Sequence, residues 1–566
     1  MATRLAPHVK TARAYAQDVV KGTIPACGWV RKACQRQLSD LARWKGSDSP
    51  YYFDQEAAEL VCKFVELMPH VKGEWARKRL TLKLQPWQCF ILTTIFGWKK
   101  TKDNTRRFRE AFILVPRKNG KSALVAPLGL YMLTRDGEEG AEVYCGASTE
   151  KQAWEVFGPA KLMAQRADSF AAHYGVEVRA RSITVLSTAS KFEPLIGNPG
   201  DGASPHMAIV DEYHEHDSPA LYDTMITGMG ARRQPLLVAI TTAGYNLGGP
   251  CYDMQIRAQK MLDGVNRDEE LFAIIYTIDD GDDWKDPETL KKANPNFGVS
   301  VMEDYLLSQQ QKAIANPSKQ NAFKTKHLDV WCNAKSAAFN MASWERCCDE
   351  SLSLSSFEGQ DCFIGLDLAS KNDLNAIVYL FPQPDGHYAV FADFFLPEDA
   401  LDNCHNADIY RGWARQGWIT LTDGGMVDYD AIEERIEEMA RRFNVLEVPY
   451  DPFQASQLVS HLAETGLTLV EFGATVKNFS EPFKTLIALT DSGKIHHNGN
   501  MVMTWCVSNT VAYTDAKDNI YPRKDRNEYK IDGTVAAIMA LGRAMSTDGV
   551  EEDGITQGFI DPWSIL

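Results

Sequence analysis

The segment VPRKNGKS, residues 115–122, has the residue types and the spacing that hold a nucleoside triphosphate. It follows the apolar run AFILV and ends in GKS, as the phosphate-loop pattern G-x-x-x-x-G-K-[ST] requires. Backbone N–H groups at a helix start attract phosphate oxygens, Lys121 can reach the β- and γ-phosphates, and the Ser122 hydroxyl can ligate Mg²⁺. The pattern departs from the motif only at Val115, where glycine is expected. We therefore predict an ATP-binding loop, followed by a helix that Pro127 should kink.

Carboxylates and hydroxyls follow two later apolar runs. MAIVDE ends with Asp211 and Glu212, and ITTAG contributes Thr241 and Thr242. A strand-end aspartate can hold Mg²⁺ through water, and the adjacent glutamate can orient and deprotonate the attacking water. The threonine hydroxyls could bond to the γ-phosphate or to that water. Upstream, Gln88 in LQPWQ could read the N6/N7 edge of adenine. Each signal alone is weak, but together with the phosphate loop they predict ATP hydrolysis.

A second set of carboxylates lies in the C-terminal part of the chain. Asp367 ends the run CFIGLD, Asp451 ends NVLEVPYD, and Asp532 is placed to cap the last predicted helix. Converging carboxylates suit Mg²⁺ or Mn²⁺, and two such ions about 3.5–4 Å apart can cleave a phosphodiester. Asp373 is a further candidate ligand. Taken singly, these are ordinary strand-end and cap residues, but their order along the chain predicts a two-metal nuclease.

The spacing of apolar runs predicts the elements that carry these residues. Helical stretches separate runs that indicate βα units around a largely parallel sheet, at 111–115, 142–147, 207–212, 235–242 and 272–278. A different order follows, with three strands in a meander, a helix, a strand and a final helix, at 362–367, 375–381, 387–396, 430–443, 444–451 and 532–545. The first pattern predicts an α/β, RecA-like P-loop ATPase domain. The second matches a ribonuclease H-like nuclease domain.

These patterns predict five segments. They are an N-terminal helical region, a P-loop ATPase motor domain, a linker, a nuclease domain and an acidic tail, at 1–60, 61–335, 336–360, 361–546 and 547–566. No apolar run approaches the roughly 18–20 residues that cross a bilayer, so we expect no membrane association. The N-terminus has no apolar signal region, and the twelve cysteines show no CxxC pair, as in a reduced cytosolic protein.

Charge is distributed unevenly along the chain. The 566 residues carry 60 Lys+Arg and 75 Asp+Glu, a net charge of −15, yet residues 1–122 carry 24 and 10, a net of +14. The most basic stretch runs from Arg77 to Lys121 and includes Arg106 and Arg107. It predicts either an ordinary solvated face or a surface that faces a polyanion such as DNA.

Taken together, the motifs resemble the large terminase subunit of tailed bacteriophages over roughly residues 15–545. They are LQPWQ, VPRKNGKS, MAIVDEYHEH, ITTAG, FKTKHLDVWCNA, FIGLDLASKNDLNA, VPYDPFQAS and KIDGTVAAIMALGRA. A missing first glycine in the phosphate loop is usual in that family. The resemblance implies that ATP is bound by Gln88, Arg117, Lys118, Asn119, Gly120, Lys121 and Ser122.

The same resemblance implies a role for each remaining motif residue. Asp211 supports Mg²⁺, Glu212 is the catalytic base and the pair Thr241–Thr242 couples hydrolysis to movement. Arg117 senses the γ-phosphate within its own chain, whereas a neighbouring subunit supplies a further arginine, for which Arg232 and Arg233 are only candidates. The nuclease would hold Mg²⁺ or Mn²⁺, as two ions, on Asp367, Asp451 and Asp532, and Asp373 stays a candidate fourth ligand from its position alone.

The resemblance also implies a function and partners. A ring of subunits, expected to be a pentamer, docks on the portal protein of an empty procapsid and threads double-stranded DNA inward with ATP. The nuclease cuts concatemeric DNA, and a small terminase subunit supplies site recognition. The protein is expected in the host cytoplasm and on the procapsid, and not in the mature virion.

Two other readings compete with this one. DEYH at 211–214 spells a DExH box, which favours a superfamily 2 helicase or translocase with an attached nuclease, but the second-domain motif Q-x-x-G-R-x-x-R is missing. A non-enzymatic capsid or scaffold protein would not hydrolyse ATP. The histidines His214, His216, His496 and His497 lack metal-ligand spacing, so we interpret them as structural or surface residues.

Overall fold

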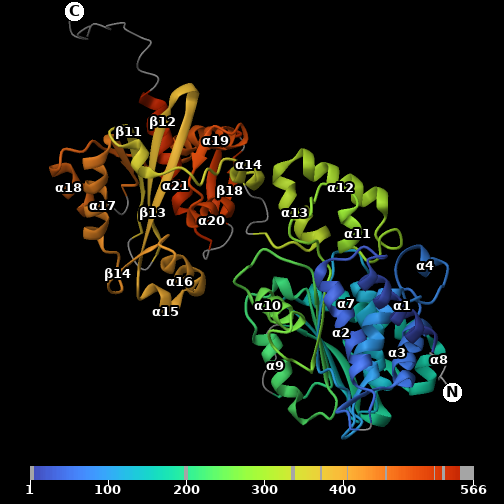
Figure 1. Cartoon of the computed structure of the whole chain (residues 1–566). Coiled ribbons are helices and arrows are strands. Elements are labelled where there is room, and N and C mark those ends of the chain that lie inside the picture. The colour runs from blue at the N-terminus through green and yellow to red at the C-terminus, as the bar shows by residue number, and fades with distance from the viewer. Residues whose placement is uncertain are drawn as a thin grey trace, which may run out of the picture. The chain divides into compact units, whose positions relative to one another are not determined.

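The computed structural model divides the chain into two compact units, Met1–Cys332 and Asn333–Leu566 (Figure 1). The structure describes residues 6–46, 48–196, 202–332, 338–369, 373–404, 406–452, 456–515, 517–524 and 529–547. Apart from Thr547, the predicted acidic tail lies outside these residues. Within them, no helix has the length and apolar composition needed to cross a membrane.

The first unit is built on an eight-stranded sheet. Its strands are β3 (Glu110–Leu114), β4 (Glu142–Ala147), β5 (Val176–Val178), β6 (Ile183–Val185), β7 (Ser190–Ile196), β8 (Met207–Asp211), β9 (Leu236–Thr241) and β10 (Leu271–Ile275). They lie in the order β10-β3-β9-β8-β4-β7-β6-β5, parallel from β10 to β7 and antiparallel at the β6 and β5 edge. The predicted α/β fold with a largely parallel sheet is confirmed.

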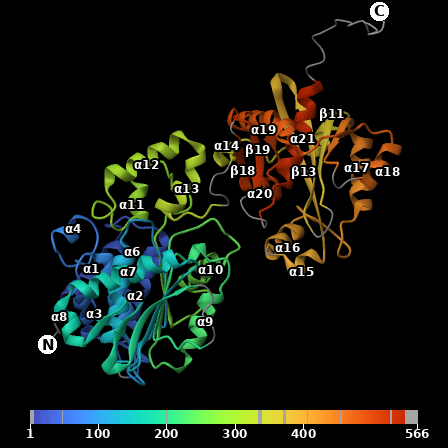
Figure 2. The same cartoon turned by 180° about the vertical axis from the view of Figure 1, so that it is seen from behind.

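Helices cover both faces of this sheet, which explains why its strands are continuous apolar runs. On β3, Ala111 and Ile113 pack into one buried cluster, whereas Phe112 and Leu114 pack into the other. Figures 1 and 2 show the elements of the two faces. The first cluster includes side chains of α5 (Pro86–Gly97), α6 (Lys121–Thr134), α7 (Glu150–Arg166) and α8 (Asp168–Tyr174), and the second those of α9 (Ala220–Gly228) and α10 (Pro250–Leu262).

The N-terminal helices share the first of these clusters. They are α1 (Pro7–Lys21), α2 (Gly28–Arg43) and α3 (Gln55–Leu67), and β1 (Tyr51–Phe53) pairs with β2 (Trp98–Lys100). Tyr15, Val19, Cys34 and Val61 are buried together with the sheet residues. The segment predicted as a polar helical region is therefore helical, but its apolar face completes the core of the ATPase sheet.

A small helical cluster follows β10 in the chain. It consists of α11 (Thr289–Ala293), α12 (Glu303–Ala315) and α13 (Pro317–Leu328). The short helix α4 (Gly73–Arg77) is not part of this cluster. Leu290, Leu306, Phe323 and Leu328 form a buried cluster of their own. This cluster bears directly on the phosphate loop, because the N–H of Arg117 donates to the carbonyl of Lys326 at 3.0 Å.

The second unit has a mixed sheet. Its strands are β11 (Asp361–Asp367), β12 (Asn375–Gln383), β13 (His387–Pro397), β14 (Thr420–Thr422), β15 (Asn444–Tyr450), β16 (Leu469–Glu471) and β17 (Ile495–His497). The order is β14-β13-β12-β11-β15-β16, with β17 beside β13. The meander β11–β13 is antiparallel, and β15 lies parallel to β11, as predicted for a ribonuclease H-like fold.

Helices cover both faces of this sheet as well, as Figure 1 shows. One face packs against α17 (Tyr429–Arg442) and α18 (Ser456–Glu464), and the other against α19 (Val476–Asp491), α20 (Met501–Asn509) and α21 (Asp532–Thr547). The remaining elements are α14 (Met341–Arg346), α15 (Ala400–Asn403), α16 (Ala407–Arg415) and the hairpin β18 (Thr510–Thr514) and β19 (Ile520–Lys524). Helix α14 lies within the segment predicted as a linker, and Trp344 of that helix is buried in the core of the second unit.

Gly365 sets the spacing between β11 and α21. A Cβ added at Gly365 would lie 2.0 Å from the carbonyl oxygen of Ala536, a distance that no side chain can occupy. Glycine therefore allows the helix to lie directly against the strand. Asp367 ends that strand and Asp532 begins that helix, so this close approach brings both carboxylates to one region.

Candidate active sites

The phosphate loop follows β3 at the carboxyl edge of the first sheet. Leu114 is paired with Thr241, and Asp211 is paired with Ile240, so the ends of β3, β9 and β8 lie side by side. Gly120 has φ 86°, a left-handed conformation that glycine adopts without a steric penalty, and it precedes the first residue of α6. The helix runs from Lys121 to Thr134 with Pro127 inside it, and the predicted kink at Pro127 stays a prediction.

Three asparagines hold the loop in place. The Asn119 amide donates to Asn294 Oδ1 at 2.9 Å, and Asn119 Oδ1 accepts from the N–H of Asn296 at 3.0 Å. The Asn296 amide donates to the Asn119 carbonyl at 3.0 Å and to Ser300 Oγ at 3.0 Å, and the Ser300 hydroxyl donates to the Lys118 carbonyl at 2.6 Å. Sequence analysis missed Asn294 and Asn296, although the motif ANPNFG that contains them is a recognisable turn signal.

Lys121 and Asp211 lie together beneath the loop. Lys121 is 8% exposed, and its ammonium donates to the Val115 carbonyl at 3.1 Å. Asp211 is 4% exposed, and burial together with the neighbouring charge of Glu212 raises its pKa to about 7, against the opposing effect of Lys121. A carboxylate in such a setting is stabilised by a cation. The donor set of Lys121, Ser122 and Asp211 therefore fits a phosphate with a bound Mg²⁺.

Glu212 stands next to Asp211 in a strained conformation. Its φ is 47°, in the left-handed region that residues other than glycine rarely adopt. Its Oε2 is buried, and within the described part of the chain it accepts no hydrogen bond. His214 Nδ1 lies 3.3 Å from that oxygen and 3.0 Å from Thr241 Oγ1. The predicted base, the predicted coupling threonine and a histidine thus meet at the ends of β8 and β9.

Asp329 is a further carboxyl at this site that sequence analysis did not single out. It is 2% exposed, and its Oδ1 accepts from the N–H of Ala243 at 3.1 Å, directly after the pair Thr241–Thr242. Burial raises its pKa well above the ordinary value, although Lys121 opposes this effect. The signal in the sequence was the FKTKHLDVW segment, which was used only for its resemblance.

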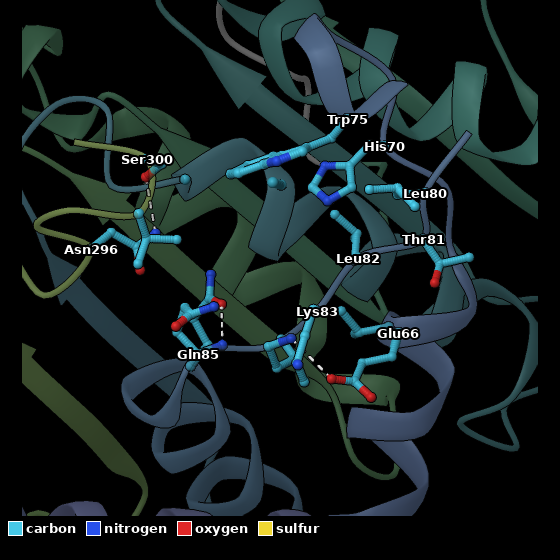
Figure 3. Close-up of a pocket in the computed structure, with 16 residues that line it drawn as sticks. Glu66, His70, Trp75, Leu80, Thr81, Leu82, Lys83, Gln85, Asn296 and Ser300 are labelled. Carbon is cyan, nitrogen blue, oxygen red and sulfur yellow. Dashed lines mark hydrogen bonds between the residues drawn. The ribbon is translucent and has the colours of Figure 1, made fainter. Parts of the chain in front are cut away.

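Two cavities meet at the phosphate loop. One, of about 1010 Å³, contacts Arg117, Lys118, Lys121, Ser122, Asp211 and Glu212. The other, of about 590 Å³, is lined by Gln85, Gln88, His70 and Trp75 (Figure 3). Gly120, Ala123, Trp75 and Ser300 line both, so the two cavities are adjacent and share a wall.

The second cavity combines an aromatic wall with amides. The rings of Trp75 and His70 lie next to each other, 4.8 Å apart between centroids, and Trp75 remains 40% exposed toward the cavity (Figure 3). Gln88 accepts a hydrogen bond from the N–H of Gln85 at 2.9 Å, and its Nε2 lies near Gly120. Gln88 therefore lies beside the loop, and its contact with adenine stays a prediction, whereas the aromatic residues were not anticipated.

The basic surface predicted between Arg77 and Lys121 is only partly present. Arg77, Lys78, Arg79, Lys83 and Lys102 are exposed. The prediction was wrong for Arg106 and Arg107, which are 1% and 0% exposed and unavailable to a polyanion. Their charges are used inside the unit, because buried arginine requires a carboxylate partner.

Each buried arginine has such a partner. Arg106 pairs with both oxygens of Asp136, at 2.9 and 3.0 Å, and Arg107 pairs with Asp40 at 2.8 Å and also with Glu269. Burial alone would raise the pKa of Asp136, but Arg106 and then His206 lower it to about 2. These ion pairs stabilise the first unit at the amino-terminal ends of β3 and β10, and the phosphate loop lies at the other end of β3.

Arg232 and Arg233, the two candidates for an arginine supplied to a neighbouring subunit, differ in their exposure and in their contacts. Arg232 is bound within its own chain, to Glu138 at 3.2 Å and to the Ser204 carbonyl at 2.8 Å. Arg233 is exposed, and its guanidinium donates to the Asp103 carbonyl at 2.8 Å.

The nuclease aspartates gather at one edge of the second sheet. Leu366 is paired with Tyr450, so Asp367 and Asp451 follow at adjacent strand ends. Burial and then the charges of Asp532, Asp451 and Asp373 raise the pKa of Asp367 well above its usual range. Burial and then Asp373 raise the pKa of Asp532 to about 6. Carboxylates that raise one another's pKa in this way form an environment that a divalent cation would stabilise.

The four carboxyls are near one another but not yet grouped as ligands. Among the described residues, no three His, Cys, Asp or Glu side chains are close enough to hold one ion. Lys530, which sequence analysis did not identify, pairs with Asp373 at 2.7 Å. The donor set therefore fits hard cations, with Asp373 engaged by an ammonium group.

The histidines read as structural divide into two groups. His216 Nε2 lies 3.3 Å from the Asp211 carbonyl oxygen, and His497 stacks on Trp344 with ring centroids 4.1 Å apart. His496 stacks on His387, with Nδ1 of His387 2.8 Å from Nε2 of His496. His214, in contrast, contacts the proposed catalytic residues.

The fold and these sites define a P-loop ATPase joined to a ribonuclease H-like nuclease. Comparison with known families agrees with this class. Residues 86–260 match the model of the terminase large subunit ATPase domain, and residues 265–548 match that of the terminase large subunit endonuclease domain. In the structure, residues 265–332 belong to the first unit, with β10 in its sheet.

The chain is also similar to individual proteins. The chain is 49% identical to "Protein YmfN" of Escherichia coli K12 over 61% of this chain and 79% of that protein. It is 27% identical to the terminase large subunit of Enterobacteria phage HK97, over 85% of this chain and 94% of that protein. The crystal structure of the HK97 large terminase has 26% identity and a TM-score of 0.42, over 86% of this chain and 99% of that one.

The chain belongs to the terminase large subunit family. It carries an ATPase domain and an endonuclease domain, and the helicase alternative is not favoured. Such an enzyme also differs in class from a capsid or scaffold protein.

Proposed function

We propose that this chain uses ATP to move double-stranded DNA into a procapsid and cuts concatemeric DNA with its second unit. The observation that carries the ATPase half is the convergence of the phosphate loop, Asp211, Glu212 and Thr241 on the ends of three neighbouring strands. Sequence positions as distant as 114 and 241 are paired there, and Gly120, Asp211 and Glu212 line the same cavity.

We infer one orientation for ATP in these two adjacent cavities. The phosphates would lie at Lys118, Asn119, Gly120, Lys121 and Ser122, where a helix N-terminus and an ammonium supply positive charge. The adenine would enter the space between Trp75 and Gln88, because an exposed indole face stacks on a base and an amide can bond to its edge.

Each remaining residue then has a role in hydrolysis. Ser122 and Asp211 would hold Mg²⁺, which supplies charge neutralisation at the phosphates when bound. Glu212 orients the attacking water and accepts its proton, and Arg117, exposed in the phosphate cavity, stabilises the γ-phosphate. Thr241 and Thr242 report the state of the site to β9.

The nuclease half rests on Asp367, Asp451 and Asp532, with Asp373 as a fourth carboxyl. These residues would hold Mg²⁺ or Mn²⁺, as two ions, which would activate water and stabilise the leaving oxygen. The mutual rise of the Asp367 and Asp532 pKa values supports this assignment, because paired anions at one edge need a cation.

The partners of this function follow from the family. We infer that the subunits form a pentameric ring on the portal protein, in the host cytoplasm, and leave before the virion matures. A small terminase subunit would select the DNA. The exposed basic residues near Arg79 offer phosphate contacts that do not depend on base sequence.

Two variants of the first unit test the ATPase assignment. We expect Lys121→Ala and Glu212→Ala to abolish ATP hydrolysis and packaging, with DNA cutting by the second unit retained. Glu212→Gln is the matched control for shape, because it keeps the side-chain volume and removes the base. Near-normal hydrolysis by Glu212→Ala would overturn the assignment of the base.

A variant of the second unit tests the nuclease. Asp451→Asn should remove metal-dependent plasmid cutting in Mg²⁺ or Mn²⁺ and leave ATP hydrolysis intact. Simultaneous loss of both activities in a folded variant would contradict two separate sites. Sequencing the product ends of the parent protein shows whether cutting is specific.

A further inference from the structure

His214 lies between the proposed base and the proposed coupling strand. It belongs to the short helical turn Tyr213–Glu215 that follows β8, and it is 8% exposed. Its backbone N–H donates to Thr241 Oγ1 at 3.1 Å, and its ring Nδ1 lies 3.0 Å from the same oxygen. Two contacts from one residue to one hydroxyl hold the turn after β8 against the end of β9.

The hydrogen bonds of Thr241 indicate that Nδ1 of His214 carries a proton. The Thr241 hydroxyl donates to the Thr242 carbonyl at 3.0 Å, so its oxygen can only accept from the ring. Nδ1 therefore carries a proton in this arrangement. Nε2 faces the opposite way, 3.2 Å from Glu215 Oε1.

The same Nδ1–H has a second acceptor within reach. Glu212 Oε2 lies 3.3 Å from Nδ1, is buried, and accepts no hydrogen bond from the residues that the structure describes. A buried carboxylate oxygen without a donor is unfavourable. One donor thus serves Thr241 and leaves Glu212 unsatisfied, next to a backbone φ of 47° that adds strain to the same residue.

The space around the ring allows a small movement rather than a free one. A Cβ added at Gly244, in the turn after β9, would lie 3.0 Å from the His214 Cβ. Thr242 Oγ1 lies 3.4 Å from Nδ1. The ring is confined between the ends of the two strands. Because its two acceptors, Thr241 Oγ1 and Glu212 Oε2, lie at similar distances, a small shift of β9 would change which of them the Nδ1–H contacts.

We propose that His214 is a positioning residue that couples β9 to the base by moving its Nδ1–H between Thr241 and Glu212. When the N–H serves Thr241, as here, the Glu212 carboxylate is free to accept a proton from water. When β9 moves and the N–H serves Glu212, the carboxylate oxygen is held by the ring and is not available to the attacking water. The proposal rests on the proposed roles of Glu212 and Thr241, and it adds the connection between them.

Two substitutions of His214 form a matched pair. The amide nitrogen of asparagine occupies the place of Nδ1, whereas that of glutamine occupies the place of Nε2. We expect His214→Asn to keep kcat within about threefold of the parent value, because the donor to Thr241 and Glu212 remains. We expect His214→Gln to lower kcat by about 10- to 100-fold with KM for ATP unchanged, because the side-chain donor that moves between Thr241 and Glu212 is lost, while the backbone N–H of residue 214 still reaches Thr241 Oγ1.

The measurements are steady-state ATP hydrolysis with full-length protein, with and without DNA, and thermal unfolding of each variant. Equal kcat values for the two variants, whether high or low, would overturn the proposal, as would a change confined to KM. If His214→Gln is also introduced into Glu212→Gln, no further loss is expected. Residual hydrolysis by Glu212→Ala would instead refute the base itself, so the two failures are distinguishable.

Discussion

Asp532→Asn should stabilise the second unit while it abolishes DNA cutting. Asp532 begins α21 next to Asp367, and burial and then Asp373 raise its pKa from 3.8 to about 6. The raised pKa means that the ionised form is disfavoured in the folded state. The destabilisation is therefore absent below pH 3.8 and complete above about pH 6. Asparagine is neutral throughout, so it removes this cost only where the aspartate is ionised.

The magnitude follows from that pKa. A rise from 3.8 to about 6 corresponds to about 3 kcal/mol at pH 8 and to about 1 kcal/mol at pH 4.5. Removing one of several repelling charges also relieves Asp367. We expect the free energy of unfolding of the second unit to rise by about 2–3 kcal/mol at pH 8 in EDTA, and by clearly less at pH 4.5.

The assay is urea unfolding followed by hydrogen exchange of peptides from β11 and β12, which reports the second unit alone. Asp423→Asn, at an exposed loop position, is the matched control and should change little at either pH. Adding Mg²⁺ should stabilise the parent protein more than the variant. A variant that is less stable than the parent at pH 8, or equally stabilised at both pH values, would refute the electrostatic reasoning.

Three further predictions concern other parts of the chain. Trp75→Ala should raise KM for ATP about tenfold, because adenine loses its stacking partner, whereas Trp75→Phe should have a KM close to normal. An unchanged KM in Trp75→Ala would mean that adenine binds elsewhere. Asp136→Asn should lower the free energy of unfolding of the first unit by about 3–5 kcal/mol, because Arg106 is left buried and unpaired, and urea unfolding followed by ATPase loss measures it. Gly365→Ala should abolish plasmid cutting and spare ATP hydrolysis, because the added methyl would meet the Ala536 carbonyl and displace α21.

Part of this protein follows directly from local sequence. The phosphate loop, the carboxylates after β8 and the threonines after β9 are contiguous motifs, and the strands that carry them are apolar runs between turns. A strand that is buried on both faces needs an unbroken apolar stretch, so the strand can be recognised in the sequence. Each motif then begins where such an apolar stretch ends. The nuclease order was readable for the same reason, from the meander and the helix and strand that follow it.

Charge was the least reliable guide, because a count of residues does not specify exposure. Arg106 and Arg107 belong to the most basic stretch of the chain, yet both are buried against carboxylates from distant segments. In the sequence, an arginine that is buried cannot be told apart from an arginine that faces DNA. Only the packing of Asp136 and Asp40 against them distinguishes the two.

By itself, the sequence determined which chemistry this protein carries, since each motif sits within a few residues and its function depends on residue type. The tertiary structure decided how those motifs meet. Asn296 lies 176 positions beyond Gly120 and holds the phosphate loop. Trp75 lines the cavity proposed for adenine, and His214, after β8, contacts Thr241 at the end of β9. These contacts join segments far apart in the chain, and such contacts are set by strand order and register, which no local pattern specifies.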